Sequence, residues 1–330
     1  MQASSLKLFQ EAIASGCDAA LLSTSRVHRL QAGPEKGPQW WIKREDESGF
    51  GISGCKRRKY ASLLPWLEQA GYREVALIGG AYSNHLYSFS QLLKERKISS
   101  EIFVKRKAIS PLKGNALLLS LLHPVETWQE IQVDTWAEAE SWVRQQLPAE
   151  TYVVPEGGSC APALPGAASL ALDIWRNQQA SGLAFDHVFI DSGTALTAGA
   201  LVLGLAWLGI SAQVHVVMMA EDEAYFQARM EIFSQWWEAW LGSQPAYQAP
   251  SLYHSVIAPA FGKVNQEVLQ ACRSIAREEG FFVDPVYTGK LLLTARHQAA
   301  RHELRGNILV VHTGGGPALL GFQDKLALLP

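Results

Sequence analysis

The sequence is poor in cysteine, and neither charge predominates. Its four cysteines have no Cys-X-X-Cys or metal-ligand spacing, so neither a disulfide framework nor a metal site is expected. A formal net charge of −2 gives no general attraction for nucleic acid or anionic membranes, so neither is expected as a partner. No uninterrupted apolar run reaches the roughly 18 residues that a membrane-spanning helix needs.

What is present indicates a cytoplasmic globular protein. The segment 1–11 carries an acidic residue early and lacks a long apolar run, which argues against a signal peptide. With unpaired cysteines, this predicts a reduced, cytoplasmic chain. A hydrophobic content of 48% with 18% charge is ordinary for a globular protein, and 330 residues predict one large or two coupled domains.

Short β-rich runs alternate with longer helical patterns, which is typical of βαβ units. The predicted strands are 75–79, 101–105, 151–155, 187–191, 213–218, 281–284 and 308–312. The predicted helices are 57–70, 84–95, 134–147, 165–179, 196–208, 219–241, 264–279, 288–304 and 317–325. The pattern alone predicts an α/β fold with open, mostly parallel sheets and flanking helices.

Polar residues follow several of these strands, at 83, 192–194, 287 and 312–314. Ligands of open parallel sheets bind outside the carboxyl ends of the strands. We therefore expect these residues to line a single cleft at one sheet edge.

Lys56 follows a glycine-rich turn, 49–55, and precedes a predicted helix. Downstream, Ser83, Asn84 and His85 stand at the start of a second strand–helix unit. A lysine held by a tight turn can form a Schiff base with a carbonyl cofactor, and its released amine can then take the Cα proton of a substrate. The alternative is a solvated lysine in a basic patch.

These motifs resemble those of the D-cysteine desulfhydrase/1-aminocyclopropane-1-carboxylate deaminase family, over about residues 43–322. The resemblance implies pyridoxal 5′-phosphate (PLP) as cofactor, a small amino acid as substrate and a homodimer. It also implies the two-domain, tryptophan-synthase-β-like fold called fold type II. A smaller α/β domain would span 49–158, and 1–48 with 159–330 would form the larger, cofactor-binding domain.

The resemblance assigns a cofactor site. Lys56 would carry the cofactor, Lys59 would contact its phosphate and Asn84 its 3′-oxygen, while Thr313 would meet the pyridine nitrogen. A hydroxyl cannot protonate that nitrogen as a carboxylate would, so the ring is expected to be a weaker electron sink that suits elimination. Asn84 and Thr313 could also cap the helices that follow them.

The phosphate loop is assigned to 191–199, which ends in Ala-Gly as the family's loop does but needs a one-residue shift to match it. The remaining cofactor contacts would be Ser192, Gly193, Thr194, Ala195, Leu196, Thr197, Thr288 and Gly314.

Tyr287, within 284–290, resembles the family's catalytic tyrosine and would transfer or gate a proton. Ser83 would bind the substrate carboxylate or relay a proton, with Asn84, His85 and Phe261 also at the substrate. Ring-opening members carry glutamate, leucine and glutamine where this chain has Thr288, Thr313 and His85. These differences favour β-elimination of the D-cysteine type.

Cys55, Tyr82 and Phe261 stand where the family has asparagine, glutamine and tyrosine. The loss of one polar group in a pocket can reject the parent substrate. An aminocyclopropanecarboxylate deaminase, a racemase of the same fold and a catalytically silent PLP-binding protein therefore remain alternatives.

Overall fold

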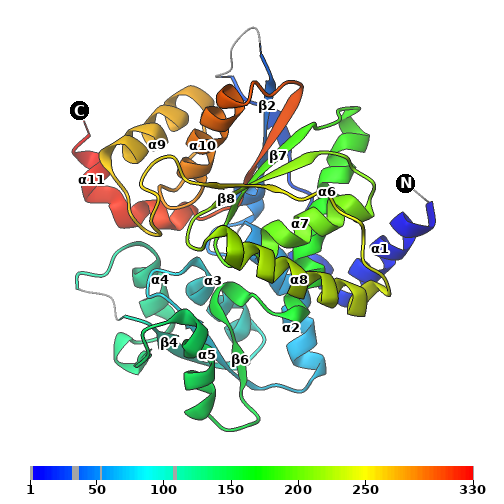
Figure 1. The fold of residues 1–330 in the computed structure, drawn as a ribbon. Coiled ribbons are helices and arrows are strands. Elements are labelled where there is room, and N and C mark those ends of the chain that lie inside the picture. The colour runs from blue at the N-terminus through cyan, green and yellow to red at the C-terminus, as the bar shows by residue number, and fades with distance from the viewer. Residues whose placement is uncertain (1–2, 32–36, 53, 107–109, 330) are drawn as a thin grey trace.

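The computed structural model describes residues 3–31, 37–52, 54–106 and 110–329, so Ser53 of the lysine turn lies outside the described residues. These residues form two sheets, seen above and below the centre of Figure 1. The first has the order β1 (Val27–Arg29), β2 (Gln39–Arg44), β10 (Asn307–His312), β7 (His187–Ser192), β8 (Gln213–Met218), β9 (Ser251–His254). The second has the order β5 (Gln129–Glu130), β4 (Ser99–Val104), β3 (Glu74–Gly79), β6 (Tyr152–Val154).

All neighbouring strands run parallel except β1 and β2. The helices are α1 (Ala3–Gly16), α2 (Cys55–Gln69), α3 (Asn84–Glu95), α4 (Gly114–Leu122), α5 (Trp136–Gln145), α6 (Leu164–Ser181), α7 (Leu196–Trp207), α8 (Glu223–Leu241), α9 (Gln266–Glu279), α10 (Thr288–Arg301) and α11 (Gln323–Ala327). The predicted α/β class with mostly parallel sheets is confirmed. No helix in the described ranges is long and apolar enough to cross a membrane.

Helices cover both faces of the six-stranded sheet, because successive side chains of a strand point to opposite faces. Along β7, Phe189 packs with α9 and α10, whereas Val188 and Ile190 pack with α6 and α7. Figure 1 shows α9 and α10 on one side of this sheet and α6 and α7 on the other. Apolar residues can therefore run continuously along each strand.

The four-stranded sheet is covered in the same way. Ala76 and Ile78 of β3 pack toward α5, and Val75 and Leu77 join the larger core with α2 and α3. All strands of this sheet lie within residues 74–154. The domain boundaries at 49 and 158 stay a prediction.

The predicted strand at 281–284 is wrong. Phe281 and Val283 are buried and Phe282 is exposed, which imitates strand alternation, but the segment pairs with no described strand. The His312 ring instead donates from Nε2 to the Phe282 carbonyl at 2.8 Å. The Asp284 carboxylate accepts N–H groups from residues 286–288 and turns the chain into α10.

The predictions missed α1, α4 and strands β1, β2, β5 and β9, and placed one helix at 317–325 where a 3-10 helix, Gly316–Phe322, precedes α11. Strand β2 is hard to recognise because it ends in Lys43 and Arg44, both buried. Such charges are buried only where partners are available, and those partners come from distant segments.

Candidate active site

Lys56 lies in the first turn of α2, against the end of β10. The Cys55 N–H donates to the Thr313 carbonyl at 2.9 Å. Gly54 has a φ of 70°, and a Cβ there would lie 2.0 Å from the same oxygen. Only glycine allows this contact, so the glycine-rich turn fixes Lys56 beside Thr313.

The Lys56 amine meets the turn after β6. Its Nζ lies 3.5 Å from the Gly157 carbonyl, and Lys59 Nζ donates to the same oxygen at 3.1 Å. Burial lowers the pKa of Lys56, although Glu156 and Asp191 oppose that shift. Burial, and then the charge of Lys56, lower the pKa of Lys59 well below its usual range. Both shifts move these amines toward the neutral form, which is the nucleophilic and proton-accepting one.

The loop between β7 and α7 lies next to this amine. A Cβ on Gly157 would be 2.9 Å from Thr194 Oγ1 and 3.4 Å from Lys56 Nζ. Ala195, which precedes α7, has a left-handed φ of 65°. The buried Thr194 Oγ1 has no hydrogen-bond partner among the described residues. The Leu196 N–H donates to the Thr194 carbonyl at 2.9 Å, but the positive end of the α7 dipole and the unused Thr194 hydroxyl fit a phosphate group.

The remaining loop residues surround this position. Ser192 and Leu196 are buried, and Gly193 and Thr197 are half-buried. Ser159 Oγ donates to the Thr194 carbonyl at 3.2 Å and itself accepts from Arg229 Nη2 at 3.2 Å. The loop is thus held by contacts from outside its own strand–helix unit.

Ser83 and Asn84 approach from the other sheet. The Ser83 side chain accepts the His85 N–H at 3.1 Å and caps α3, so the capping considered for Asn84 belongs to Ser83. Asn84 Oδ1 accepts from Asn115 Nδ2 at 2.8 Å. A Cβ on Gly315 would be 3.5 Å from Asn84 Nδ2, which places Asn84 beside the turn after β10.

His85 and Phe261 differ in burial. His85 is fully buried, with ring Nδ1 3.0 Å from the Tyr60 hydroxyl. Burial, and then the charges of Lys56 and Lys59, lower its pKa well below its usual range, so its ring is neutral. Phe261 is 53% exposed, and its ring centroid lies 6.0 Å from that of Tyr287.

Tyr287 precedes α10 and lies beside the loop between β7 and α7. Its Cε1 and hydroxyl would be 3.7 and 4.0 Å from a Cβ on Gly193. Burial, and then the nearby Asp191, raise the pKa of its phenol, so it keeps its proton. Thr288 is fully buried, and its hydroxyl lies 3.4 Å from the His312 ring.

Thr313 does not cap the helix that follows it. Gly315 precedes that 3-10 helix without a side-chain cap, and the Thr313 hydroxyl donates to Asp191 Oδ1 at 2.5 Å. Gly314, with a φ of 109°, is buried at the same turn.

The predicted residues come together, but not at one sheet edge. Ser83 follows β3 of the four-stranded sheet, Thr194 and Thr313 follow strands of the six-stranded sheet, and Tyr287 follows no strand. The expectation of a single edge is therefore wrong, and the site is built where the ends of two sheets face each other.

The sequence predictions missed two carboxylates that lie near Lys56. These belong to Asp191 and Glu156. Burial raises the pKa of each to about 7. Asp191 follows the apolar residues 188–190 near the end of β7, and Glu156 precedes the Gly157-Gly158 turn. An acidic residue at the end of a buried strand is the signal that could have identified Asp191.

The three departures from the family pattern differ in position. Cys55 is buried in the core, whereas the Tyr82 side chain is exposed, as that of Phe261 is. Cys55 therefore affects packing, and Phe261, beside Tyr287, is the change best placed to alter substrate choice.

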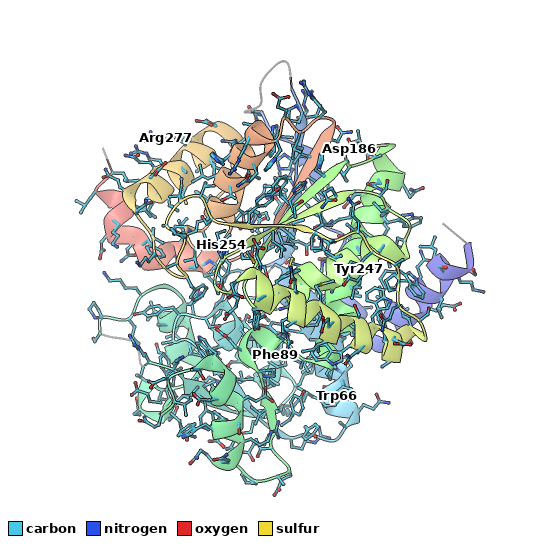
Figure 2. The ribbon with its side chains drawn as sticks, viewed as in Figure 1. Trp66, Phe89, Asp186, Tyr247, His254 and Arg277 are labelled. Atoms are coloured by element: carbon cyan, nitrogen blue, oxygen red, sulfur yellow. The ribbon has the colours of Figure 1, made fainter. Side chains whose placement is uncertain are left out.

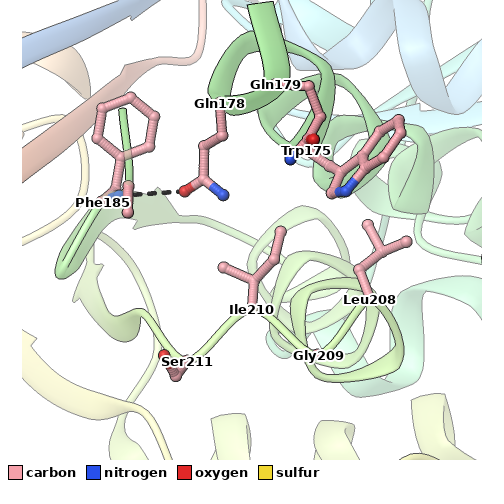
Figure 3. A pocket seen from close by; sticks show the side chains of 9 residues that line it. Trp175, Gln178, Gln179, Phe185, Leu208, Gly209, Ile210 and Ser211 are labelled. Atoms are coloured by element: carbon pink, nitrogen blue, oxygen red, sulfur yellow. Dashed lines mark hydrogen bonds between the residues drawn. The ribbon is translucent and has the colours of Figure 1, made fainter. Parts of the chain in front are cut away.

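A separate cavity of about 310 Å³ lies at the other end of α6 and α7. Figure 3 shows Trp175, Phe185, Leu208 and Ile210 lining it, with Gln178 accepting the Phe185 N–H at 3.1 Å. No predicted site residue is among its lining residues, so it does not belong to the Lys56 site.

The chain is similar to known proteins over most of its length. The family model "Pyridoxal-phosphate dependent enzyme" matches residues 23–314. A D-cysteine desulfhydrase of Yersinia pestis is 29% identical, over 88% of this chain and 90% of the relative. A Pyrococcus abyssi protein, provisionally named a 1-aminocyclopropane-1-carboxylate deaminase, is 27% identical over 88% and 89%. The crystal structure of an ACC deaminase homologue superposes with a TM-score of 0.85, at 24% identity over 97% and 98% of the two chains.

Proposed function

Since the chain belongs to the family of pyridoxal-phosphate-dependent enzymes, we propose that it catalyses β-elimination from a small amino acid such as D-cysteine. The observation that carries the proposal is the Lys56 amine, held at the Gly157 carbonyl beside Thr194 with a lowered pKa. The chain is homologous to D-cysteine desulfhydrase and to ACC deaminase relatives at 25–29% identity. We further propose that it works in the cytoplasm as a homodimer.

The residues divide the work as follows. Lys56 would carry the cofactor on its amine and, once released, would take the Cα proton. Thr194 and the start of α7 would hold the phosphate, with Lys59 nearby, and Asn84 and Thr313 would contact the ring. When bound, the cofactor delocalises the negative charge that develops at Cα.

Ser83 and Tyr287 are assigned to the substrate. Ser83 caps the N-terminus of α3. The positive end of the helix dipole favours a substrate carboxylate there. Tyr287 retains its phenolic proton and lies beside Gly193, one residue before Thr194. It can therefore supply or gate a proton during elimination.

We expect Tyr287→Phe to lower kcat by about 100-fold or more, because it removes a general acid without emptying the space of the ring. Cofactor absorbance should be unchanged. Tyr247→Phe, in the loop after α8 (Figure 2), is the matched control and should leave kcat unaltered. Steady-state kinetics with the preferred substrate will decide, and an unchanged kcat for Tyr287→Phe would make this tyrosine structural.

The two threonines decide between elimination and ring opening. Thr288 and Thr313 place hydroxyls where the ring-opening branch has a carboxylate and a leucine. Elimination needs a leaving group on Cβ, and thiolate leaves readily because thiols have a pKa of about 8.5. Phe261 makes the outer part of the site more apolar, which favours a side chain bulkier than that of cysteine.

The test is a side-by-side assay of D-cysteine, β-chloro-D-alanine and aminocyclopropanecarboxylate. Pyruvate release from the first two should exceed 2-oxobutyrate release from the third by at least about 10-fold, a barrier difference of about 1.4 kcal/mol. Dominant 2-oxobutyrate release would overturn the elimination assignment. Turnover of none of the three by a cofactor-loaded protein would contradict the D-cysteine-like substrate.

A further inference from the structure

The buried Asp191 and the half-buried Thr313 form a pair at the carboxyl ends of two adjacent strands. Strands β7 and β10 are paired in parallel, so residues that follow their carboxyl ends lie side by side. The Thr313 hydroxyl donates to Asp191 Oδ1 at 2.5 Å, and Asp191 is only 8% exposed. The backbone of Thr313 is also held, because its carbonyl accepts the N–H of Cys55, the residue before Lys56.

This hydrogen bond determines what Thr313 can offer to a third group. A threonine hydroxyl has one hydrogen and two lone pairs. When Asp191 is ionised, that hydrogen is used on the carboxylate, and the Thr313 oxygen can only accept. Any further group that forms a hydrogen bond with the Thr313 hydroxyl oxygen must then be the donor.

We propose that Asp191, acting through Thr313, keeps the ring nitrogen of the cofactor protonated. The inference rests on the proposed function, which places Thr313 at that nitrogen. The chain of groups is a ring N–H that donates to Thr313 Oγ1, which donates to Asp191 Oδ1. The proton is shared along this chain, so it is present on the ring when the carboxylate is ionised and on the carboxyl when the ring is neutral.

The surroundings support this role. Burial raises the pKa of Asp191 to about 7, and Lys56 opposes that shift, so the carboxylate can hold or release a proton near neutral pH. The sequence-based expectation of a weaker electron sink, which considered a hydroxyl alone, is revised: Asp191 strengthens the sink without touching the ring.

Asp191 is thus a positioning residue, and it is tested by the protonation state of the ring. The purified protein is loaded with pyridoxal phosphate that is isotope-labelled at the ring nitrogen, and its nitrogen NMR resonance is recorded. We expect the position of a protonated pyridine nitrogen in the unaltered protein. In Asp191→Asn, which keeps the shape and a hydrogen bond to Thr313, the resonance should move to the unprotonated position.

Further variants separate this role from a structural one. Thr313→Val should give the same unprotonated signal, and Thr313→Ser, which restores the hydroxyl, should give the protonated one. The control is Asp186→Asn, at the opposite end of β7 (Figure 2), where Asp186 accepts the Asn307 N–H at 2.7 Å. Asp186→Asn should leave the ring-nitrogen resonance at the protonated position.

An unprotonated nitrogen in the unaltered protein, or a protonated one in both Asp191→Asn and Thr313→Val, would overturn the inference while leaving Lys56 and the elimination reaction in place. Failure of the unaltered protein to take up the cofactor would overturn both this inference and the proposed function.

Discussion

A Lys56→Ala variant is expected to lose turnover by roughly 10,000-fold, the upper end of the range for removing a general base. The loss is large because the same amine links the cofactor and takes the Cα proton. The contacts of Thr194 and the start of α7 remain, so the variant should still bind the cofactor without a covalent link. Visible spectra and activity with the preferred substrate, measured on the same sample, test both statements.

Two further variants make the Lys56 result specific. Lys56→Arg keeps a long nitrogen-bearing side chain but cannot link to a carbonyl, and it should be as inactive as Lys56→Ala. Lys94→Ala, at an exposed position near the end of α3, should retain full activity. Residual activity above about a tenth of the unaltered rate in Lys56→Ala, a cost below about 1.4 kcal/mol, would contradict the assignment.

An Asp173→Asn variant is expected to lose about 3–5 kcal/mol of unfolding free energy. Asp173 Oδ2 accepts from Lys43 Nζ at 2.7 Å and from Arg58 Nη2 at 2.6 Å, and Arg58 Nε also donates to Glu45 at 2.6 Å. All of these side chains are at most 5% exposed. Without Asp173, two buried cations would share one carboxylate.

This charge cluster, Lys43, Glu45, Arg58 and Asp173, joins β2, α2 and α6. Arg58 is two residues from Lys56, so the cluster also anchors the helix start that carries the reactive amine. Urea unfolding without added cofactor will measure the loss, since a ligand would add its own binding energy. The control is Glu11→Gln, which breaks the exposed Lys7–Glu11 pair and should cost less than about 0.5 kcal/mol. A loss below about 1 kcal/mol for Asp173→Asn would contradict a stabilising role for the cluster.

Much of the fold was predictable because its strands are mostly apolar and its helices show helical periodicity. The helix starts were less exact: Ser83 caps the predicted helix 84–95, whereas Asp222 and Asn265 cap α8 and α9 from inside the predicted ranges 219–241 and 264–279. The segment 281–284 misled the prediction because its alternating burial comes from packing and from a hydrogen bond to His312, not from strand pairing. Periodicity does not distinguish these causes.

The site was predictable where a local motif carries the chemistry, as for Lys56 behind its glycine turn. The sequence could not show that Asp191 meets Thr313, which lies 122 positions away. Nor could it show that Ser83 approaches from a second sheet, because such contacts depend on how distant strands pack. Lys290 is another buried lysine, but its role is structural. Its amine donates to the Ala258 carbonyl at 2.8 Å, so this lysine holds the turn before Phe261.

The most direct test of the central claim is borohydride reduction of the cofactor-loaded protein, followed by peptide mass mapping. Reduction fixes the cofactor to the lysine that carries it. The account predicts a single labelled peptide that contains Lys56, and no label in the Lys56→Ala variant. A label on Lys59 or Lys290 would contradict it.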